Sequence, residues 1–258
     1  MKYTEVIGEI YKRTREKKGC FKETVIKDLI GIKIINRFED EEILPDFLMI
    51  ERLYQRIGES SDIFTIMMTS EEYDYCKWRE NLIEKIISGK ICKSDWVSRF
   101  AKDRTINELL QEQFVKFWKG YDDSDAELMK KAIRMTVPEF PDKMSMHQCI
   151  GREEFAYMLY YIERKLQKNP KEWMQEYETV RFILKYINLN YETQELVRIY
   201  ARAACVYGEL IPIDDIDDKI HHYKSALDLQ RKYARVSSID RLLYGLICSY
   251  KQLEQEIP

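Results

Sequence analysis

The chain has 258 residues, with 42 Lys and Arg against 45 Asp and Glu and a formal net charge of −3. A charge this close to zero excludes a basic surface spread over the whole chain, the usual footprint of a nucleic-acid-binding protein. The hydrophobic content of 45% predicts a packed core, and only 9 Gly and 6 Pro leave few of the tight turns that a β-sandwich or barrel needs. We therefore predict an all-α protein.

Six cysteines lie far apart, without a CxxC or other paired spacing: Cys20, Cys76, Cys92, Cys149, Cys205 and Cys248. This spread is typical of reduced, mostly buried thiols rather than of a disulfide framework. The N-terminus is amphipathic rather than secretory, and no apolar run reaches the roughly 18 residues of a membrane span. The sequence predicts a cytoplasmic protein that does not engage a membrane.

Residues 1–65 predict a small helical head of four to five helices, because apolar residues recur every three to four positions between glycine stops. The expected helices are Lys2–Lys18, Lys22–Ile30, a third that carries Ile32, Ile34, Ile35 and Phe38, and a fourth that Asp46 caps and Gly58 ends. Four short helices within this length indicate a compact bundle.

Longer helices with short connections are expected from Ser70 onward. Their ranges are Ser70–Ser88, Lys93–Asp103, Ile106–Gly120, Ser124–Met135, Arg152–Lys168, Lys171–Ile187, Thr193–Glu209, Asp217–Val236 and Ser238–Glu256. Ser70 and Ser124-Asp125 are candidate N-terminal caps. Short loops between helices imply antiparallel neighbours.

The last three of these helices follow the spacing of tetratricopeptide (TPR) repeats. Tyr223 and Ala226 match the second helix of a unit, in which a small residue lets a neighbouring helix approach and an aromatic ring fills the gap. The helices before and after it place apolar residues with the 4–7–8–11 spacing of a first helix. We therefore predict that residues 66–258 form a TPR-like α-solenoid.

A motif in residues 7–58 carries a resemblance to a known family. It consists of Ile10–Gly19, Val25-Ile26, Ile35–Glu39, Pro45 and Ile50–Leu53, with the spacing kept without gaps. The motif resembles the Xre-type, lambda-repressor-like family of helix-turn-helix regulators. The rest of the chain, including Ala132–Phe140, is similar to the sensor half of Xre–TPR regulators that bind short peptide signals. The resemblance implies a transcription regulator that binds double-stranded DNA as a homodimer on two half-sites.

The resemblance also implies which residues would contact DNA: Lys22, Lys33, Asn36 and Arg37. Asn36 suits adenine, while Lys22 and Lys33 can reach guanine or phosphate. The two lysines have an alternative as solvated surface charges. For Arg37 we favour an ion pair within the head, to Glu39 or Glu51.

The sequence departs from the family where bases and phosphates would be contacted. Ile32 and Ile34 replace Ser/Thr, and the acidic turn Asp40–Glu42 replaces a turn that usually offers Asn-Gly-Lys/Arg. Residues 1–65 hold twelve Lys and Arg against thirteen Asp and Glu, a net charge of −1. Two hypotheses remain open: a DNA-binding regulator, and a protein-interaction module whose head has lost DNA contact. The net charge of −1 and the acidic turn favour the second, while the retained spacing and the cations Lys22, Lys33 and Arg37 favour the first. Ile32 and Ile34 have an alternative role as a surface that docks on the solenoid or on a second subunit.

A concave groove is the expected ligand site of the repeat domain. The TPR spacing directs a set of basic and tyrosine side chains toward it: Tyr157, Tyr161, Arg198, Arg202, Arg241, Tyr244 and Lys251. Arginine binds carboxylates and tyrosine gives rigid contact area, so a short peptide or protein segment is the expected ligand. Alternatively the cations are solvated and the tyrosines belong to the core.

Catalytic and metal-binding patterns are not found in the sequence. His221 and His222 are adjacent on a helix and point to different faces, and His147 has no evident partner. The carboxylates of Asp214–Asp218 lack the glycine and glutamate of a calcium loop and are expected to cap the next helix. We expect no cofactor, no metal and no enzymatic activity.

Overall fold

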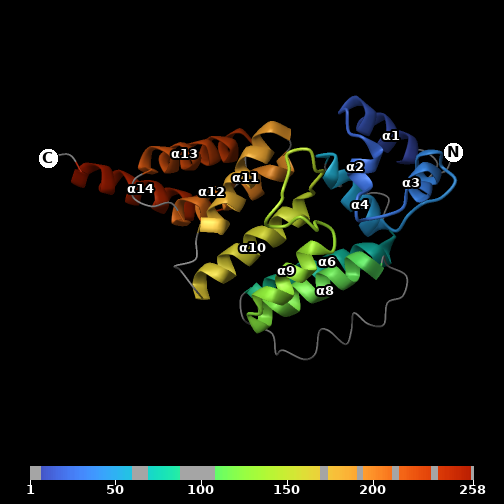
Figure 1. Cartoon of the computed structure of the whole chain (residues 1–258), viewed down its shortest axis with the longest axis horizontal. Helices are drawn as coiled ribbons and strands as arrows, with labels where there is room; N and C mark the ends of the chain where they lie inside the picture. The colour runs from blue at the N-terminus through green and yellow to red at the C-terminus, as the bar shows by residue number, and fades with distance from the viewer. Residues whose placement is uncertain are drawn as a thin grey trace. The chain divides into compact units, whose positions relative to one another are not determined.

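The computed structural model describes residues 7–59, 69–87, 108–168, 174–190, 194–210, 215–233 and 238–256. Within these ranges the chain forms helices and no strand (Figure 1), which confirms the all-α prediction. The chain divides into two compact units, Met1–Tyr157 and Met158–Pro258, and the division falls inside a helix. The predicted boundary between residues 65 and 66 lies outside the described residues and stays a prediction.

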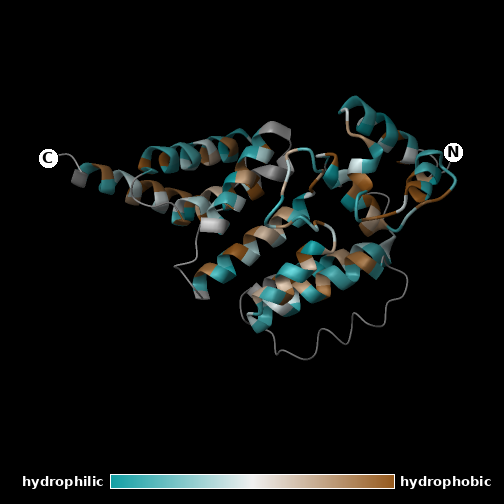
Figure 2. Cartoon of the chain, viewed as in Figure 1, coloured by the Kyte–Doolittle hydropathy of each residue, from teal (hydrophilic) through white to brown (hydrophobic). Residues whose placement is uncertain are grey.

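Polar (teal) and apolar (brown) residues mix along the helices (Figure 2), and the buried ones recur every three to four positions. An apolar stripe along a helix is buried against its neighbours while the polar side faces water. This is the periodicity from which the helices were predicted. None of the described helices is both long and apolar enough to cross a lipid bilayer.

The first unit begins with four short helices. They are α1 (Ile7–Lys17), α2 (Lys22–Ile26), α3 (Ile32–Glu39) and α4 (Phe47–Arg56). Asp46 caps α4 as predicted, because its carboxylate accepts a hydrogen bond of 3.2 Å from the backbone N–H of Met49.

The predicted helix Lys22–Ile30 is too long, since α2 ends at Ile26. The backbone carbonyls of Val25 and Lys27 accept hydrogen bonds of 2.9 and 2.6 Å from the Arg56 guanidinium. Asp28 also adopts a left-handed φ of 60°, which breaks a right-handed helix. A contact with a distant arginine therefore overrides the local helical preference.

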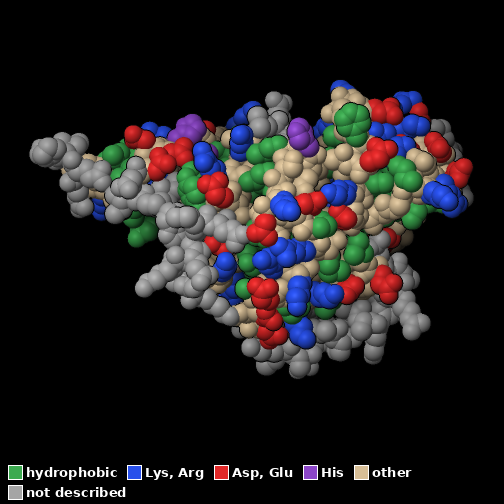
Figure 3. Space-filling model, in the orientation of Figure 1, with side chains coloured by type: hydrophobic (Ala, Val, Ile, Leu, Met, Phe, Trp, Pro, Cys, Tyr) green, Lys and Arg blue, Asp and Glu red, His purple; other side chains and the backbone are tan. Residues whose placement is uncertain are grey.

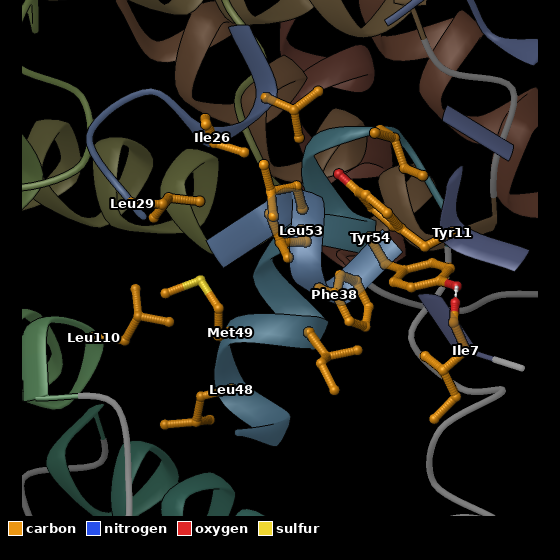
Figure 4. Packing of buried hydrophobic residues seen from close by; sticks show 14 residues of the cluster. Ile7, Tyr11, Ile26, Leu29, Phe38, Leu48, Met49, Leu53, Tyr54 and Leu110 are labelled. Carbon is orange, nitrogen blue, oxygen red and sulfur yellow. Dashed lines mark hydrogen bonds between the residues drawn. The ribbon is translucent and has the colours of Figure 1, made fainter. Parts of the chain in front are cut away.

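Aromatic rings fill the core of these four helices (Figure 4). The Tyr11 ring of α1 lies between Phe38 of α3 and Tyr54 of α4, with centroid distances of 5.5 and 5.2 Å. Such tilted and edge-on ring pairs are favourable geometries for aromatic packing. The aliphatic side chains of Val25, Ile35 and Leu53 complete a core that water does not reach.

The first unit continues with α6 (Ser70–Ile87), α8 (Glu108–Asp123), α9 (Ala126–Arg134) and the beginning of α10 (Arg152–Lys168). The predicted helix Lys93–Asp103 lies outside the described residues. One predicted cap is displaced by one residue and the other is confirmed. Thr69 rather than Ser70 precedes α6, where it exchanges hydrogen bonds with Glu72. Within the predicted cap Ser124-Asp125, Asp125 caps α9 by accepting a hydrogen bond from the N–H of Leu128.

The second unit contains the rest of α10 with α11 (Met174–Asn190), α12 (Gln194–Leu210), α13 (Ile216–Lys232) and α14 (Ile239–Glu256). From α11 onward each helix packs against the next, and α12 also packs against α14. Acidic residues Asp217 and Asp218 occupy the first turn of α13, as expected for a helix N-terminus. The TPR-like superhelical stacking of these helices stays a prediction.

The Tyr223 ring of α13 packs closely against glycines of α12 and α14. A Cβ atom at Gly208 would lie 2.0 Å from the Tyr223 hydroxyl oxygen, and one at Gly245 would lie 2.4 Å from the Tyr223 Cζ. Only glycine leaves room for this ring, which is buried. This is the kind of contact that the spacing of Tyr223 predicts.

Candidate functional site

Helix α3 presents one side to the core and the other to solvent. Ile35, Phe38 and Glu39 are buried, which fixes the helix in the bundle. Its other side is exposed and consists of Ile32, Lys33, Ile34, Asn36 and Arg37. We call this exposed side, together with Lys22 at the start of α2, the α3 face. All four predicted DNA-contacting residues belong to it.

Three of these four residues are engaged within the head. The Lys22 ammonium donates to Asn36 Oδ1 at 2.8 Å and lies 2.9 Å from Glu39 Oε2. The Arg37 guanidinium donates to Glu42 at 3.1 Å, with both side chains more than half exposed. Lys33 is exposed on the first turn of α3. The structure thus brings Lys22 and Asn36 together and places Lys33 and Arg37 beside them on the same surface.

The expected partners of Arg37 were wrong, although an ion pair within the head is present. Glu39 is buried and binds the Arg15 Nε at 2.7 Å, as well as Lys22. Glu51 lies 3.5 Å from Arg152 instead. Glu42, in the acidic turn after α3, is therefore the carboxylate that Arg37 reaches.

The acidic turn is partly neutralised by its neighbours. Lys12 of α1 lies 3.3 Å from Asp40, and Arg37 holds Glu42. Lysine and arginine side chains alternate with aspartate and glutamate over the surface shown in Figure 3. The α3 face is therefore a patch of mixed character, with two exposed isoleucines among its polar groups.

A cluster of largely buried arginines and glutamates, not expected from the sequence, joins α4 of the head to α6 and α10. Its members are Arg52 and Arg56 of α4, Arg79 of α6, and Glu153 and Glu154 of α10. Arg52 and Arg56 stand one turn apart, and the glutamates are adjacent about a hundred positions later in the chain. No local pattern links such distant residues, so sequence reasoning had no signal for the pairing.

Each carboxylate of this cluster binds two guanidinium groups. Glu153 lies 2.7 Å from both Arg52 and Arg79, while Glu154 lies 2.8 Å from Arg56 and 3.3 Å from Arg52. Burial raises the pKa of Glu153, but Arg79 and Arg52 outweigh that effect and the pKa falls to about 2. Both glutamates are thus held as carboxylates, which is the condition for stable burial of the arginines.

A pocket of about 250 Å³ lies beside this cluster, within the first unit. Its lining includes Glu23 and Lys27 of the α2 region, Arg56, and Glu139, His147 and Cys149 of the segment before α10. Lys27 and Glu139 form an ion pair at the pocket. The lining contains cationic and anionic side chains and a thiol, so it does not favour a ligand of either charge.

In the second unit, two predicted peptide-binding arginines converge on one carboxylate. Glu163 of α10 binds Arg202 of α12 and lies 2.8 Å from Arg241 of α14. The Arg202 guanidinium also lies over the Tyr160 ring, 3.5 Å from its centroid. Arg241 is held in addition by Glu209 at 2.7 Å. Sequence reasoning identified the arginines but missed Glu163, Tyr160 and Glu209.

The other predicted groove residues are distributed differently. Tyr157 and Tyr161 are buried, so both belong to the core rather than to an open surface. Tyr157 stacks on Phe117 at 4.3 Å between centroids, which places its ring inside the first unit. Tyr244 is 71% exposed and Lys251 is exposed on α14. Arg198 belongs to α12, but its side chain lies outside the described part of the structure.

The structure therefore brings predicted site residues together in two places. One is the α3 face in the first unit, and the other is the group of Glu163, Arg202 and Arg241 in the second, which we call the Glu163 cluster. Each contains cations that are already engaged by carboxylates of the chain. Comparisons with family models, curated proteins and solved structures give no match to this chain.

Proposed function

We propose that this chain is a DNA-binding transcriptional regulator of the Xre helix-turn-helix type, with a TPR-like C-terminal unit that senses a short peptide or protein segment. The observation that carries the proposal is the α3 face. Helix α3 comes after α2 and a short turn, one side is fixed in the core, and Lys33 and Asn36 are exposed on the other. A helix held in this way can enter the major groove of DNA. The proposed protein acts in the cytoplasm as a homodimer and catalyses no reaction.

The chemistry of the α3 face suits a mixture of base and phosphate contacts. Asn36 can pair with adenine, and Lys33 can reach guanine or a phosphate. Lys22 would exchange its contacts with Asn36 and Glu39 for a phosphate oxygen. The exposed Ile32 and Ile34 can touch thymine methyl groups.

The Glu163 cluster supports a sensing role for the second unit. Arg202 and Arg241 come from different helices and bind one carboxylate, so they are already positioned for a carboxylate ligand. A peptide carboxylate would displace Glu163, and the exposed Tyr244 ring would add contact area. The packing of α12 against both α13 and α14 is consistent with stacked helix pairs.

The DNA-binding half is tested by selection from a random duplex pool across a salt series. The full-length protein is expected to retain a subset of sequences, with affinity that falls as salt rises. The double variant K33E/N36A should lose about tenfold or more in affinity, because one change repels phosphate and the other removes a base contact. K131E, a charge reversal of an exposed lysine on α9, is the matched control and should lose much less.

A second function, a protein-interaction module, is favoured by a different set of observations. Ile32 and Ile34 are 41% and 43% exposed, and Lys22 is neutralised by the buried Glu39. Apolar side chains beside cations that already form ion pairs are better suited to binding a protein partner than to binding DNA, a polyanion. Failure to retain any duplex at low salt, with K33E/N36A indistinguishable from the unaltered protein, would reject the regulator and leave this alternative.

The sensing half is tested with a pool of random hexapeptides that carry free C-terminal carboxylates. R202A/R241A should abolish retention, whereas E163Q should strengthen it by removing the competing charge. R231A, which removes an exposed arginine on α13, is the control and should not change retention. Equal retention of C-terminally amidated peptides would contradict carboxylate recognition by the arginines.

A further inference from the structure

The pocket next to Arg56 lies between two segments of the first unit that are distant in the sequence. One wall is formed by α2 and the turn after it, residues 23–28, and the other by residues 136–150, between α9 and α10. The two segments run side by side (Figure 1), and Lys27 of the first forms an ion pair with Glu139 of the second. The pocket is therefore a product of the folded unit and not of a local motif.

Arg56 holds both walls in place. Its guanidinium donates to the carbonyls of Val25 and Lys27 on one wall, at 2.9 and 2.6 Å, and to the Thr136 carbonyl on the other at 2.8 Å. Glu154 binds the same guanidinium, and the Arg56 side chain is only 2% exposed. The walls are thus fixed by contacts within the chain, so a ligand would not have to order them on binding.

The lining is apolar at the floor and charged at the rim. Val137 and Ile150 are buried, whereas Glu23, Lys27 and His147 are exposed. The buried members form the floor and the exposed members form the rim. An apolar floor with a few polar groups around it is the usual character of a site for a small molecule.

Charges of both signs face each other across the rim. The Lys27 ammonium donates a hydrogen bond to the Glu139 carboxylate, and this bond lowers the pKa of Glu139. Glu23 and Asp28 add exposed carboxylates on the wall that carries Lys27. A ligand with a single charge would meet a like charge on the rim. A ligand with an ammonium and a carboxylate group finds a counter-ion for each of them.

The volume of the pocket limits the size of the ligand. The pocket holds about 250 Å³, which is more than the roughly 150 Å³ of an engineered protein cavity that takes up benzene. It is smaller than the roughly 300 Å³ at which sites for drug-sized ligands begin. This space suits one apolar group of about the size of an aromatic ring with a short polar end.

We propose that this pocket binds a free α-amino acid with an apolar side chain. The side chain would pack on Val137 and Ile150. The ammonium group would take the place of Lys27 beside Glu139, and the carboxylate would bind Lys27. The pocket is distinct from the α3 face and from the Glu163 cluster, so the inference does not depend on the proposed function. Since one wall is α2, such a ligand would contact the head directly.

The test titrates the full-length protein with apolar L-amino acids (valine, leucine, isoleucine, methionine and phenylalanine) up to about 10 mM by isothermal calorimetry. At least one of them is expected to bind. Its amide lacks the carboxylate and its N-acetyl derivative lacks the ammonium, so each should bind about tenfold more weakly or worse. Glycine, which has no side chain, should not bind. Absence of binding by all five amino acids, or equal binding of the amide and the N-acetyl derivative, would overturn the proposal.

Variants of the rim locate the binding site. K27M and E139Q should each weaken binding of the amino acid by about tenfold, because each removes one counter-ion. K77M/E80Q removes a comparable exposed ion pair on α6 and is the matched control, with unchanged affinity expected. Both rim residues are partly or largely exposed, and thermal melts would verify that the variants fold. Loss of binding in R202A/R241A without loss in K27M would place the amino acid at the Glu163 cluster and refute this assignment.

Discussion

At the scale of single residues, the buried arginines of the first unit depend on two glutamates. Arg52 and Arg56 are almost fully buried, and each lies within ion-pair distance of Glu154. Arg56 also donates to the carbonyl of Thr136 at 2.8 Å, beyond its two bonds to the α2 region. A buried guanidinium with so many acceptors is stable only while the carboxylates stay charged. The protonation of the glutamates therefore controls the stability of the unit.

Glu153 makes this dependence measurable. Its pKa in the folded unit is about 2, below the ordinary value of 4.5. The folded-state pKa is depressed, so the stabilisation is complete above about pH 4.5 and is lost as the pH falls toward 2. We expect a loss on the order of 3 kcal/mol over this interval, seen as a falling urea midpoint.

The variant E153Q should be less stable at neutral pH and should show a flatter stability profile between about pH 5 and 2, because its side chain has no proton to gain. E127Q, which changes an exposed glutamate on α9, should match the unaltered protein throughout. Parallel profiles for E153Q and the unaltered chain would show that Glu153 does not carry the pH dependence.

At the scale of helices, the Tyr223 ring decides how closely three helices of the second unit approach. The glycines at 208 and 245 meet the same end of the ring, so a side chain on either helix would push it toward the other. The ring is only 3% exposed. We expect G208A to destabilise the unit by about 1 to 3 kcal/mol through overpacking, as measured by denaturant unfolding.

Removal of the Tyr223 hydroxyl should relieve part of that clash. The Cβ of an alanine at 208 would meet the hydroxyl oxygen at 2.0 Å and the Cζ at 2.4 Å. Y223F in the G208A background should therefore recover part of the lost stability, whereas Y223F alone should give no such gain. If the stability changes of G208A and Y223F simply add in the double variant, the alanine at 208 destabilises the unit through a contact other than the Tyr223 hydroxyl.

The helices themselves are set by local chemistry, which explains why most of them were predicted. Helix α10 has the predicted bounds Arg152–Lys168, because a regular apolar period runs between two clear ends. The exceptions have non-local causes. Helix α2 ends early because Arg56, about thirty residues later, donates hydrogen bonds to the backbone carbonyls of Val25 and Lys27.

The sites were predictable only in part, for the same reason. The identity of Arg202 and Arg241 comes from helical spacing, whereas their common partner Glu163 belongs to another helix that no periodicity connects to them. The partner of Arg37 was mispredicted for the same reason. Glu39 binds Arg15, which is distant in the chain, and Arg37 binds Glu42. The periodicity along the chain predicts whether a side chain faces the core or solvent. It does not predict which residue, distant in sequence, forms an ion pair with it.

At the scale of the whole molecule, the first four helices are not energetically separate from the later helices of their unit. Arg52 and Arg56 of α4 bind carboxylates of α10, and Leu110 of α8 packs into the same core as the head. A fragment of residues 1–65 would leave both guanidinium groups without their glutamates, at a cost of several kcal/mol. We expect that fragment to lack a cooperative thermal transition in circular dichroism.

A fragment of residues 1–168 keeps α10 and should melt cooperatively. The longer fragment with R56A should lose much of that cooperativity, since Glu154 would then lack its partner. A sharp transition for residues 1–65 alone would show instead that the head is stable without α10.

The Arg52 and Arg56 pairing also bears on any attempt to exchange the head between proteins. A hybrid that joins these helices to a different sensor would bring two charged groups against a partner with no anions to receive them. The recipient would need two adjacent acidic residues at the start of the facing helix, in the register that Glu153 and Glu154 occupy here. Transplantation should therefore succeed only when the acidic pair travels with the head.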